Sequence, residues 1–557
     1  MLDQPGQSPL TLHDRFAATA ARHPDVVATI ESVAGTPVRT TYAELAAEVA
    51  DVRRRLAAHG VGRGDRVAYW GENRRELLVW QVAVAATGAG LVGTNTRYRA
   101  PEVGHVLETA RPVLVVMPRS LVGLALTDLL HSAVDRAAQA VGADWVAPQV
   151  AVMDLTRPTG VPAPARGAED LAAFDAGAGA WWADEPAVGD LPDPVGTPED
   201  LAMTFTTSGS TGLPKLAAHA QRGIARHAEE VAAATGLGVG DVMCAALPMT
   251  GVFSYVPAVS ALLAGASTLL VPVFDGAGTI ALMAEHGVTH TAGGDDFYLG
   301  LATGWEAERP ALPAWRVAAE ASFIGRVEQL NGWLQECSGA SMRGVYGSSE
   351  VFSLVSIRDA DADPTTRHLG GGRLVSADLG VRTVDPVGGE PLAPGEVGLL
   401  QFRGYNVVDA YLRGAEQVPP PLVDGWFDSG DLGSVDADGR TFTYEGRAGD
   451  AMRLRGFLVQ PAEIEHFLIE DPSVGMVKVV GAQVEGRDVA VAFVTAAEGR
   501  DVDPEALRAA CKAELAPFKV PERVVVIDEM PVTSGTNGSK IKAGVLRERA
   551  GELLAPR

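Results

Sequence analysis

Residues 204–215 read Thr204-Phe-Thr-Thr-Ser-Gly-Ser-Thr-Gly-Leu-Pro-Lys215, a run of hydroxyl side chains with two glycines and one lysine. Glycine lets the main chain turn tightly and approach a ligand closely, so such a loop points several N–H groups at one spot. The ammonium of Lys215 adds a compact positive charge. The stretch therefore predicts a polyphosphate site. A polar surface loop is the alternative, since these residue types are common in loops. The loop is not a Walker loop, because residues 209–215 lack the Gly-Lys-Ser/Thr ending.

The residues on either side of this loop predict a strand over 201–206 and a helix over 221–234. The same alternation occurs earlier, where we expect, in order, a strand at 66–70, a helix at 74–86, a strand at 91–93, a helix at 101–109 and a strand at 113–117. Strands that alternate with helices predict a parallel sheet covered by helices. The first clear helix begins near Thr41, which forms a capping box with Glu44.

Other regions of the chain differ in character from these alternating strands and helices. Residues 251–274 carry no charge but contain prolines, a glycine and serines, which favours a buried helix and a buried strand over a membrane span. Residues 157–200, rich in Pro, Gly, Ala and Asp, predict a long surface excursion. From 375 to 445 the pattern is β-rich, and the last hundred residues predict a separate small α/β domain that begins near 446–450.

Composition restricts the partners and the compartment. The chain has 557 residues, 47% of them apolar, and a net charge of −24. A field of this sign disfavours nucleic acid and anionic membrane surfaces. The three cysteines are far apart, and the N-terminus lacks the features of a signal peptide, so we expect a cytoplasmic protein without disulfides.

Four further motifs follow the loop in order. They are Tyr346-Gly-Ser-Ser-Glu350, Gly425-Trp-Phe-Asp-Ser-Gly-Asp431, Gly446-Arg447-Ala-Gly-Asp450 and Asn537-Gly-Ser-Lys540-Ile541. Together with residues 204–215 they resemble the motifs of the adenylate-forming, or AMP-binding, superfamily, which includes acyl- and aryl-CoA synthetases, luciferases and peptide-synthetase adenylation domains. The resemblance covers roughly residues 12–548, and Ser349 stands where the family has threonine.

The resemblance implies an α/β fold in two parts. A large adenylating domain, residues 1–447, would combine parallel-sheet βα subdomains with a β-rich subdomain, and a mobile lid, residues 448–557, would carry the catalytic lysine. The implied activity is ATP-dependent activation of a fatty or aryl carboxylic acid as its acyl-adenylate, with pyrophosphate release and transfer to CoA. The implied cofactors are ATP, Mg²⁺ and CoA, and a homodimer is compatible with the sequence.

The family motifs assign roles to particular residues. Lys540, Glu350 and Ser349 are expected to be catalytic, Glu350 and Thr211 to bind Mg²⁺, and Asp450 to be the hinge between the two parts. Asp431 is expected to accept hydrogen bonds from the ribose. The expected ATP-binding residues are Thr207, Ser208, Gly209, Ser210, Thr211, Gly212, Lys215, Tyr346, Gly347, Ser348, Asp431 and Arg447.

The sequence departs from the family pattern around the acid. Pro248-Met-Thr-Gly251 has glycine where many acyl-CoA synthetases have histidine, and 316–323 replaces a common Gly-Gly-Ala-Pro. Gly293-Gly-Asp-Asp-Phe297 stands where a Gly-x-Pro stretch is frequent. The acid-pocket candidates are Thr250, Gly251, Phe253, Asp295, Asp296 and Ser322. The two aspartates are interpreted either as partners of a substrate amine or as helix-capping carboxylates.

The acceptor stays open at this point. Residues 451–457 lack the Ser-Gly-Gly of many CoA ligases, although Arg455 and Gly456 are candidates for contact with CoA. A carrier-protein thiol, an amine, or nitrite as used by diazo-forming relatives are the alternatives. A catalytically silent nucleotide-binding scaffold is the alternative from another class, and the retention of Lys215, Glu350 and Lys540 argues against it.

Overall fold

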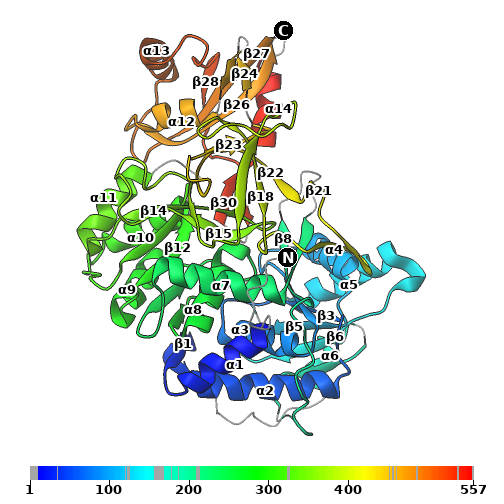
Figure 1. Cartoon of the computed structure of the whole chain (residues 1–557). Helices are drawn as coiled ribbons and strands as arrows, with labels where there is room; N and C mark the ends of the chain where they lie inside the picture. Colours follow the sequence, from blue (N-terminus) through cyan, green and yellow to red (C-terminus); the bar gives the residue numbers. More distant parts are fainter. Residues whose placement is uncertain are drawn as a thin grey trace.

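The computed structural model describes residues 11–33, 35–119, 121, 126–155, 169–176, 178–185, 187, 189–207, 214–322, 327–450, 452–454, 457–459, 461–484, 487–535 and 538–554. Two large sheets with helices packed on them form most of the molecule, and the elements after residue 450 form a smaller body at one end (Figure 1). The predicted α/β fold class is confirmed.

The first large sheet has a parallel centre. Its strands run in the order β20-β19-β9-β8-β4-β3-β5-β6-β7. These strands are β3 (Arg66–Tyr69), β4 (Gly90–Gly93), β5 (Leu114–Pro118), β6 (Gln149–Met153), β7 (Ala180–Trp182), β8 (Leu201–Thr207), β9 (Lys215–Ala220), β19 (Ala410–Arg413) and β20 (Glu416–Val418). The intervening helices are α3 (Arg75–Ala86), α4 (Ala100–Ala110) and α5 (Leu126–Val141). The predicted βαβαβ run is confirmed, because β3 pairs in parallel with both β4 and β5.

Helix α2 (Tyr42–Ala58) shows how local sequence sets an element. The Glu44 carboxylate accepts a hydrogen bond from the Thr41 N–H at 2.7 Å, and the Thr41 hydroxyl accepts one from the Glu44 N–H at 3.3 Å. This is the capping box predicted from the sequence. The helix then buries the apolar face formed by Leu45, Val49 and Leu56, which fixes it against the core.

The second large sheet is parallel in one half. The parallel strands are β1 (Val27–Val33), β10 (Val242–Ala245), β11 (Ser267–Leu270), β12 (His290–Gly294), β13 (Val317–Ala321) and β14 (Met342–Ser348), with β2 (Thr36–Thr41) antiparallel at the edge. The helices of this half are α1 (Leu12–Arg22), α7 (Gln221–Thr235), α8 (Val252–Ala264), α9 (Gly276–His286), α10 (Asp295–Trp305) and α11 (Val327–Ser338).

The charge-free stretch 251–274 folds as predicted, into a buried helix and a buried strand. Every residue of α8 from Val252 to Leu263 is buried, and β11 follows it. Within the described residues, no helix combines the length and the apolar character needed to cross a bilayer.

The other half of the second sheet is antiparallel and continues from β14. Its strands are β15 (Phe352–Ile357), β16 (Gly371–Leu374), β17 (Gly380–Val384), β18 (Gly398–Arg403), β21 (Leu422–Val423), β22 (Trp426–Val435) and β23 (Thr441–Arg447). The predicted β-rich region is confirmed. The change from parallel to antiparallel pairing falls at the β14–β15 turn, which holds Ser349 and Glu350.

The elements after residue 450 have their own sheets and core. They are β24 (Met452–Leu454), β25 (Phe457–Val459), α12 (Pro461–Ile469), β26 (Val474–Val484), β27 (Arg487–Ala496), α13 (Pro504–Glu514), β28 (Arg523–Val526), β29 (Val532–Gly535), β30 (Gly538–Ile541) and α14 (Ala543–Leu554). Among the described strands, none of these pairs with a strand before them. The β29–β30 hairpin reaches away from this body and lies against α10 (Figure 1).

The expectation for residues 157–200 was wrong in part. Helix α6 (Glu169–Ala172) and strand β7 lie in this segment, and β7 pairs in parallel with β6. Trp182 of β7 is only 3% exposed, and the Arg119 guanidinium lies 5.1 Å from the centre of its ring. An aromatic pair at the sheet edge thus outweighs the surrounding turn-forming composition. Residues 156–168 lie outside the described part.

Candidate active site

A cavity of about 2360 Å³ lies where the two large sheets and the C-terminal elements meet. Thr207 and Lys215 come from the first sheet, Ser348 and Ala321 from the carboxyl ends of parallel strands in the second, and Glu465 from α12. Ligands of parallel α/β sheets bind beyond the carboxyl ends of the strands, so the cavity lies where the fold predicts a site.

Many of the site residues predicted from the sequence line this cavity. They are Thr207, Lys215, Phe253, Ser322, Tyr346, Gly347, Ser348, Ser349, Glu350, Asp431, Arg447 and Asp450. Thr250, Gly251, Asp295 and Asp296 are not among the lining residues. Ser208, Gly209, Ser210, Thr211, Gly212, Arg455 and Gly456 lie outside the described residues, as does the side chain of Lys540.

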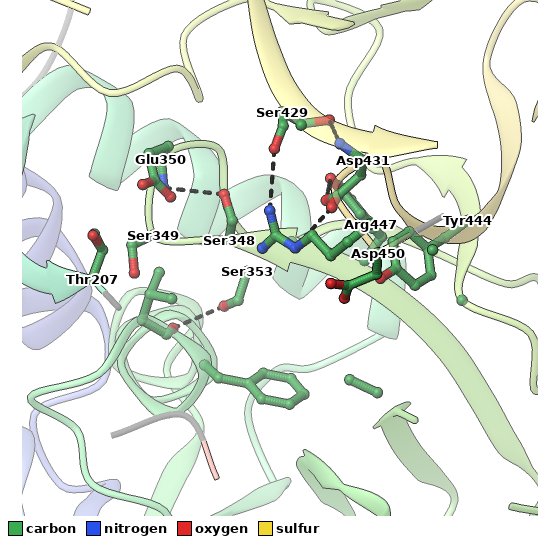
Figure 2. Close-up of a pocket in the computed structure, with 18 of the residues that line it drawn as sticks. Thr207, Ser348, Ser349, Glu350, Ser353, Ser429, Asp431, Tyr444, Arg447 and Asp450 are labelled. Atoms are coloured by element: carbon green, nitrogen blue, oxygen red, sulfur yellow. Dashed lines mark hydrogen bonds and ion pairs between the residues drawn. The ribbon is translucent and has the colours of Figure 1, made fainter. Parts of the chain in front are cut away.

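The carboxylate of Asp431 is held rigidly at one end of the cavity. Asp431 is 4% exposed, accepts a hydrogen bond from the Tyr346 hydroxyl, and lies 3.0 Å from Nε of Arg447. Burial and the neighbouring Asp431 charge raise the pKa of Tyr346, so the phenol remains a donor. Figure 2 shows Asp431 and Arg447 on adjacent strands, with Ser429 contacting both. The result is a preorganised acceptor at the cavity wall.

Thr207, Ser349 and Glu350 lie together at the other end of the group drawn in Figure 2. Thr207 and Lys215, the residues that bracket the predicted phosphate loop, are paired on β8 and β9. The carboxylate of Glu350 forms no ion pair with any residue that the structure describes. A carboxylate and a lysine that line the same cavity suit a site that receives both a cation and a polyphosphate.

The segment that carries Ser349 and Glu350 is strained and tightly held. Phe352 and Leu354 have φ values of 63° and 55°, which side-chain-bearing residues seldom adopt. Donors from other elements hold its carbonyl groups, namely His219 Nε2 on Ser349 at 2.7 Å, Val408 N on Glu350 at 2.7 Å, Asn406 Nδ2 on Val351 at 3.1 Å and His227 Nε2 on Ser353 at 2.7 Å. This set of donors compensates for the strain and fixes the segment.

The two histidines of this set also stack on the strained residue. The rings of His219 and His227 lie 4.0 Å and 4.9 Å from the ring of Phe352, centre to centre. Burial lowers the pKa of both imidazoles to about 4, so both are neutral at pH 7 with the proton on Nε2. The sequence offered no signal for His227 or Asn406, because neither lies in a motif.

Replacing His227 with glutamine should make the stability of the protein less dependent on pH below about pH 6.5. An imidazole whose pKa is lower in the folded state takes up a proton on unfolding, so its contribution is full above about pH 6.5 and is lost as the pH falls toward 4. That contribution is on the order of 3 kcal/mol. The amide of glutamine can still donate to Ser353 but does not titrate. Melting temperatures from pH 7 down to 4.5 should fall less steeply in H227Q than in wild type.

The matched control is His131→Gln, at a half-buried position of α5 that does not line the cavity. H131Q should retain the wild-type slope. Equal slopes in H227Q and wild type would show that the buried imidazole does not control acid stability.

The inner wall of the cavity is mostly apolar, with Val252, Phe253, Leu354 and Val327 beside Ser322. Behind it, Asp295 and Asp296 occupy the first turn of α10, whose N-cap is Gly294. The prediction that the two aspartates cap the helix is therefore wrong, because neither is the N-cap residue. A carboxylate in the first turn nevertheless interacts favourably with the helix dipole.

The hinge candidate Asp450 is tied to the C-terminal body. Its carboxylate accepts a hydrogen bond from Arg547 of α14, and its N–H donates to the Arg447 carbonyl at 3.0 Å. The same residue thus contacts the end of β23 and the helix that follows β30. Any rotation of the body about this position would have to release or carry the Arg547 contact.

Comparison with known proteins agrees with this geometry. The sequence model of the AMP-binding enzymes matches residues 16–412, and that of their C-terminal domain matches 463–535. A feruloyl-CoA synthase of Amycolatopsis sp is 30% identical over 553 residues, 96% of each chain. An indoleacetate–CoA ligase of Aromatoleum aromaticum is 30% identical over 512 residues, 89% of this chain and 90% of that one. The structure of ATP-bound MatB from Rhodopseudomonas palustris is similar with a TM-score of 0.79 at 26% identity, over 98% of this chain and 100% of that one.

Proposed function

Because this chain belongs to the AMP-binding enzyme family, we propose that its cavity joins an organic acid to ATP as an acyl-adenylate, releases pyrophosphate, and passes the acyl group to CoA. The enzyme is an AMP-forming acid–thiol ligase that uses ATP and CoA. The observation that carries the proposal is the convergence of Lys215, Glu350 and Asp431 on one cavity from positions far apart in the sequence.

The geometry suggests how the parts of ATP are distributed. Asp431, oriented by Tyr346 and Arg447, would accept the ribose hydroxyl groups. Thr207 and Lys215 would hold the phosphates that leave, and the Ser349 hydroxyl would donate to the α-phosphate. The acid would then occupy the apolar wall around Phe253, with its carboxylate facing the α-phosphorus.

Glu350 is the residue that we propose holds Mg²⁺, together with phosphate oxygens. Its carboxylate lines the cavity next to Ser349, and a hard cation prefers such oxygens. Bound there, Mg²⁺ would neutralise phosphate charge. The chain's own contribution is the position of the carboxylate, which Val408 secures through the Glu350 carbonyl at 2.7 Å.

Glu350→Gln should raise the Mg²⁺ concentration needed for half-maximal pyrophosphate release by about tenfold or more, because the amide keeps the shape but loses the charge. The measurement is a Mg²⁺ titration at saturating ATP. Glu416→Gln on the exposed strand β20 is the matched control and should titrate as wild type. An unchanged titration for E350Q would remove Glu350 from the metal site.

The two-part division at 447/448 also remains our proposal, supported by the separate sheets and core that follow it. In the described state the β29–β30 hairpin lies against α10 and Ile541 lines the cavity. We propose that this arrangement is the adenylating pose and that the thioester-forming pose requires rotation about Asp450. Mg²⁺ dependence, dimerisation and a cytoplasmic location belong to the same set of proposals.

A pyrophosphate-release assay over a panel of acids, with and without CoA, tests the proposed function. Since the relatives include ligases of feruloyl and indoleacetyl groups, the panel begins with ferulate and indoleacetate and adds fatty acids. We expect acid-dependent pyrophosphate release and a thioester that accumulates only with CoA. Free adenylate released in the presence of CoA would favour a carrier thiol, an amine or nitrite as the acceptor.

A further inference from the structure

A buried carboxyl group beside the cavity has no partner among the described residues. Glu320, on β13, is fully buried, and neither of its carboxyl oxygens forms a hydrogen bond with that part of the chain. It forms no ion pair with any arginine or lysine in the part of the chain that the structure describes. Buried polar groups in proteins are almost always satisfied, so an exception of this kind points to something that binds there.

A second buried carboxyl group lies close to the first. Asp295, in the first turn of α10, is also 0% exposed, and Ser322 Oγ lies 3.4 Å from its Oδ2 atom. Burial, reinforced by the charge of Asp295, raises the pKa of Glu320 well above its usual range. Burial therefore favours the neutral form of Glu320 in the free enzyme.

The strand register places Glu320 between two glycines of the neighbouring strands, close to residues that line the cavity. Glu320 pairs with Gly293 on β12 and Gly344 on β14, so all three share one face of the sheet. A Cβ atom on Gly344 would lie 2.1 Å from the carbonyl oxygen of Leu369, and Leu369 lines the cavity. Ala321 and Ser322, the two residues that follow Glu320 in the chain, both line the cavity. Glu320 is thus adjacent in sequence to the cavity lining.

We propose that Glu320 and Asp295 form a subsite for a protonated amine carried by the acid substrate, reached from the cavity past Ser322. This inference rests on the proposed function and narrows its substrate to an amino-substituted carboxylic acid. An ammonium group offers three N–H donors, enough for both carboxyl groups and the Ser322 hydroxyl. Its positive charge favours the ionised form of Glu320, whose proton leaves to solvent on binding.

Glycine at positions 293 and 344 is consistent with this assignment. Side chains on the flanking strands would occupy the same face as Glu320, and at both positions a Cβ atom would collide with existing neighbours, Phe297 at 2.3 Å and the Leu369 carbonyl at 2.1 Å. The strands on both sides of Glu320 therefore need glycine at these positions, and Ser322 is the residue of the proposed subsite that lines the cavity.

Matched pairs of acids test the subsite. Each pair contains an acid and the same acid with one added ammonium group: benzoate and its para-aminomethyl derivative, phenylpropanoate and its para-aminomethyl derivative, hexanoate and its ω-amino derivative, octanoate and its ω-amino derivative. The readout is kcat/KM for acid-dependent pyrophosphate release. In wild type the ammonium member of the pair with the fitting length should be preferred by about 10- to 100-fold.

Glu320→Gln should reduce this preference to near one while kcat/KM for the unmodified acid stays within about twofold. Glu336→Gln makes the same change on α11, where the side chain is 58% exposed, and should retain the full preference. Thermal denaturation checks folding, and E320Q should melt close to wild type because a neutral carboxyl group and an amide are similar in shape and in the cost of their burial.

A wild-type enzyme that turns over unmodified acids but shows no preference for any ammonium partner overturns the subsite and leaves the proposed function standing. A preference that survives in E320Q overturns the role of Glu320. The wild-type comparison decides the first point even if E320Q fails to fold. Absence of pyrophosphate release with every acid, ferulate and indoleacetate included, would instead refute the proposed function and this inference with it.

Discussion

Lys540→Ala should abolish acid-dependent ATP–pyrophosphate exchange while ATP still binds. Adenylation brings a carboxylate against the α-phosphate, so two anions must be held together and a cation is needed between them. Lys540 lies on β30, the strand that reaches from the C-terminal body to α10, and the next residue, Ile541, lines the cavity. Loss of one charge partner of the transition state costs about 10²–10³ in kcat.

Lys542→Ala is the matched control for this experiment. Lys542 is two residues further on, just beyond the strand, where its N–H donates to the Pro531 carbonyl at 2.7 Å. K542A should exchange at close to the wild-type rate, and ATP binding measured by calorimetry should be similar in all three proteins. Undiminished exchange by K540A, or an equal loss in K542A, would contradict the assignment of the decisive cation to Lys540.

The parts of the fold that local sequence determines were predictable. The capping box at Thr41 and Glu44 sets the start of α2. The charge-free stretch forms α8 and β11 because its apolar residues are buried, and Gly265 ends the helix in the left-handed conformation. In both cases neighbours in the sequence decide the structure. The order of the motifs likewise predicted which residues line the cavity, since Tyr346 and Asp431 meet although 85 residues separate them.

The parts that depend on distant contacts were not predictable. Strand β9 contains Ala217-Ala-His-Ala, which has little strand propensity, and it forms because β8 and β19 pair with its two edges. The hydrogen bonds that fix the segment after Ser349 also depend on distant parts of the chain. Their donors come from β9, α7 and the loop before β19. Glu320 could be seen in the sequence as a departure, but its missing partner is visible only in three dimensions.

Asp431→Asn should raise KM for ATP by about 10- to 100-fold, with a smaller effect on kcat. Hydrogen bonds to a charged group contribute about 1.5–3 kcal/mol each, and a carboxylate that accepts from a ribose loses that charge in the amide. The group is preorganised, since it is 4% exposed and held by Tyr346 and Arg447. Asp436→Asn, in the exposed turn between β22 and β23, is the matched control and should leave KM unchanged.

ATP analogues that lack one ribose hydroxyl group distinguish a direct contact between Asp431 and the ribose from an effect of D431N on the shape of the cavity wall. In wild type, removal of the contacted hydroxyl should cost about tenfold in kcat/KM, whereas in D431N the same removal should cost little more, because the interaction is already lost. Tyr346→Phe leaves the carboxylate in place but frees one of its oxygens, so it should retain the analogue sensitivity. Equal penalties for the analogues in wild type and D431N would mean that Asp431 orders the cavity wall through Tyr346 and Arg447 without touching the ribose.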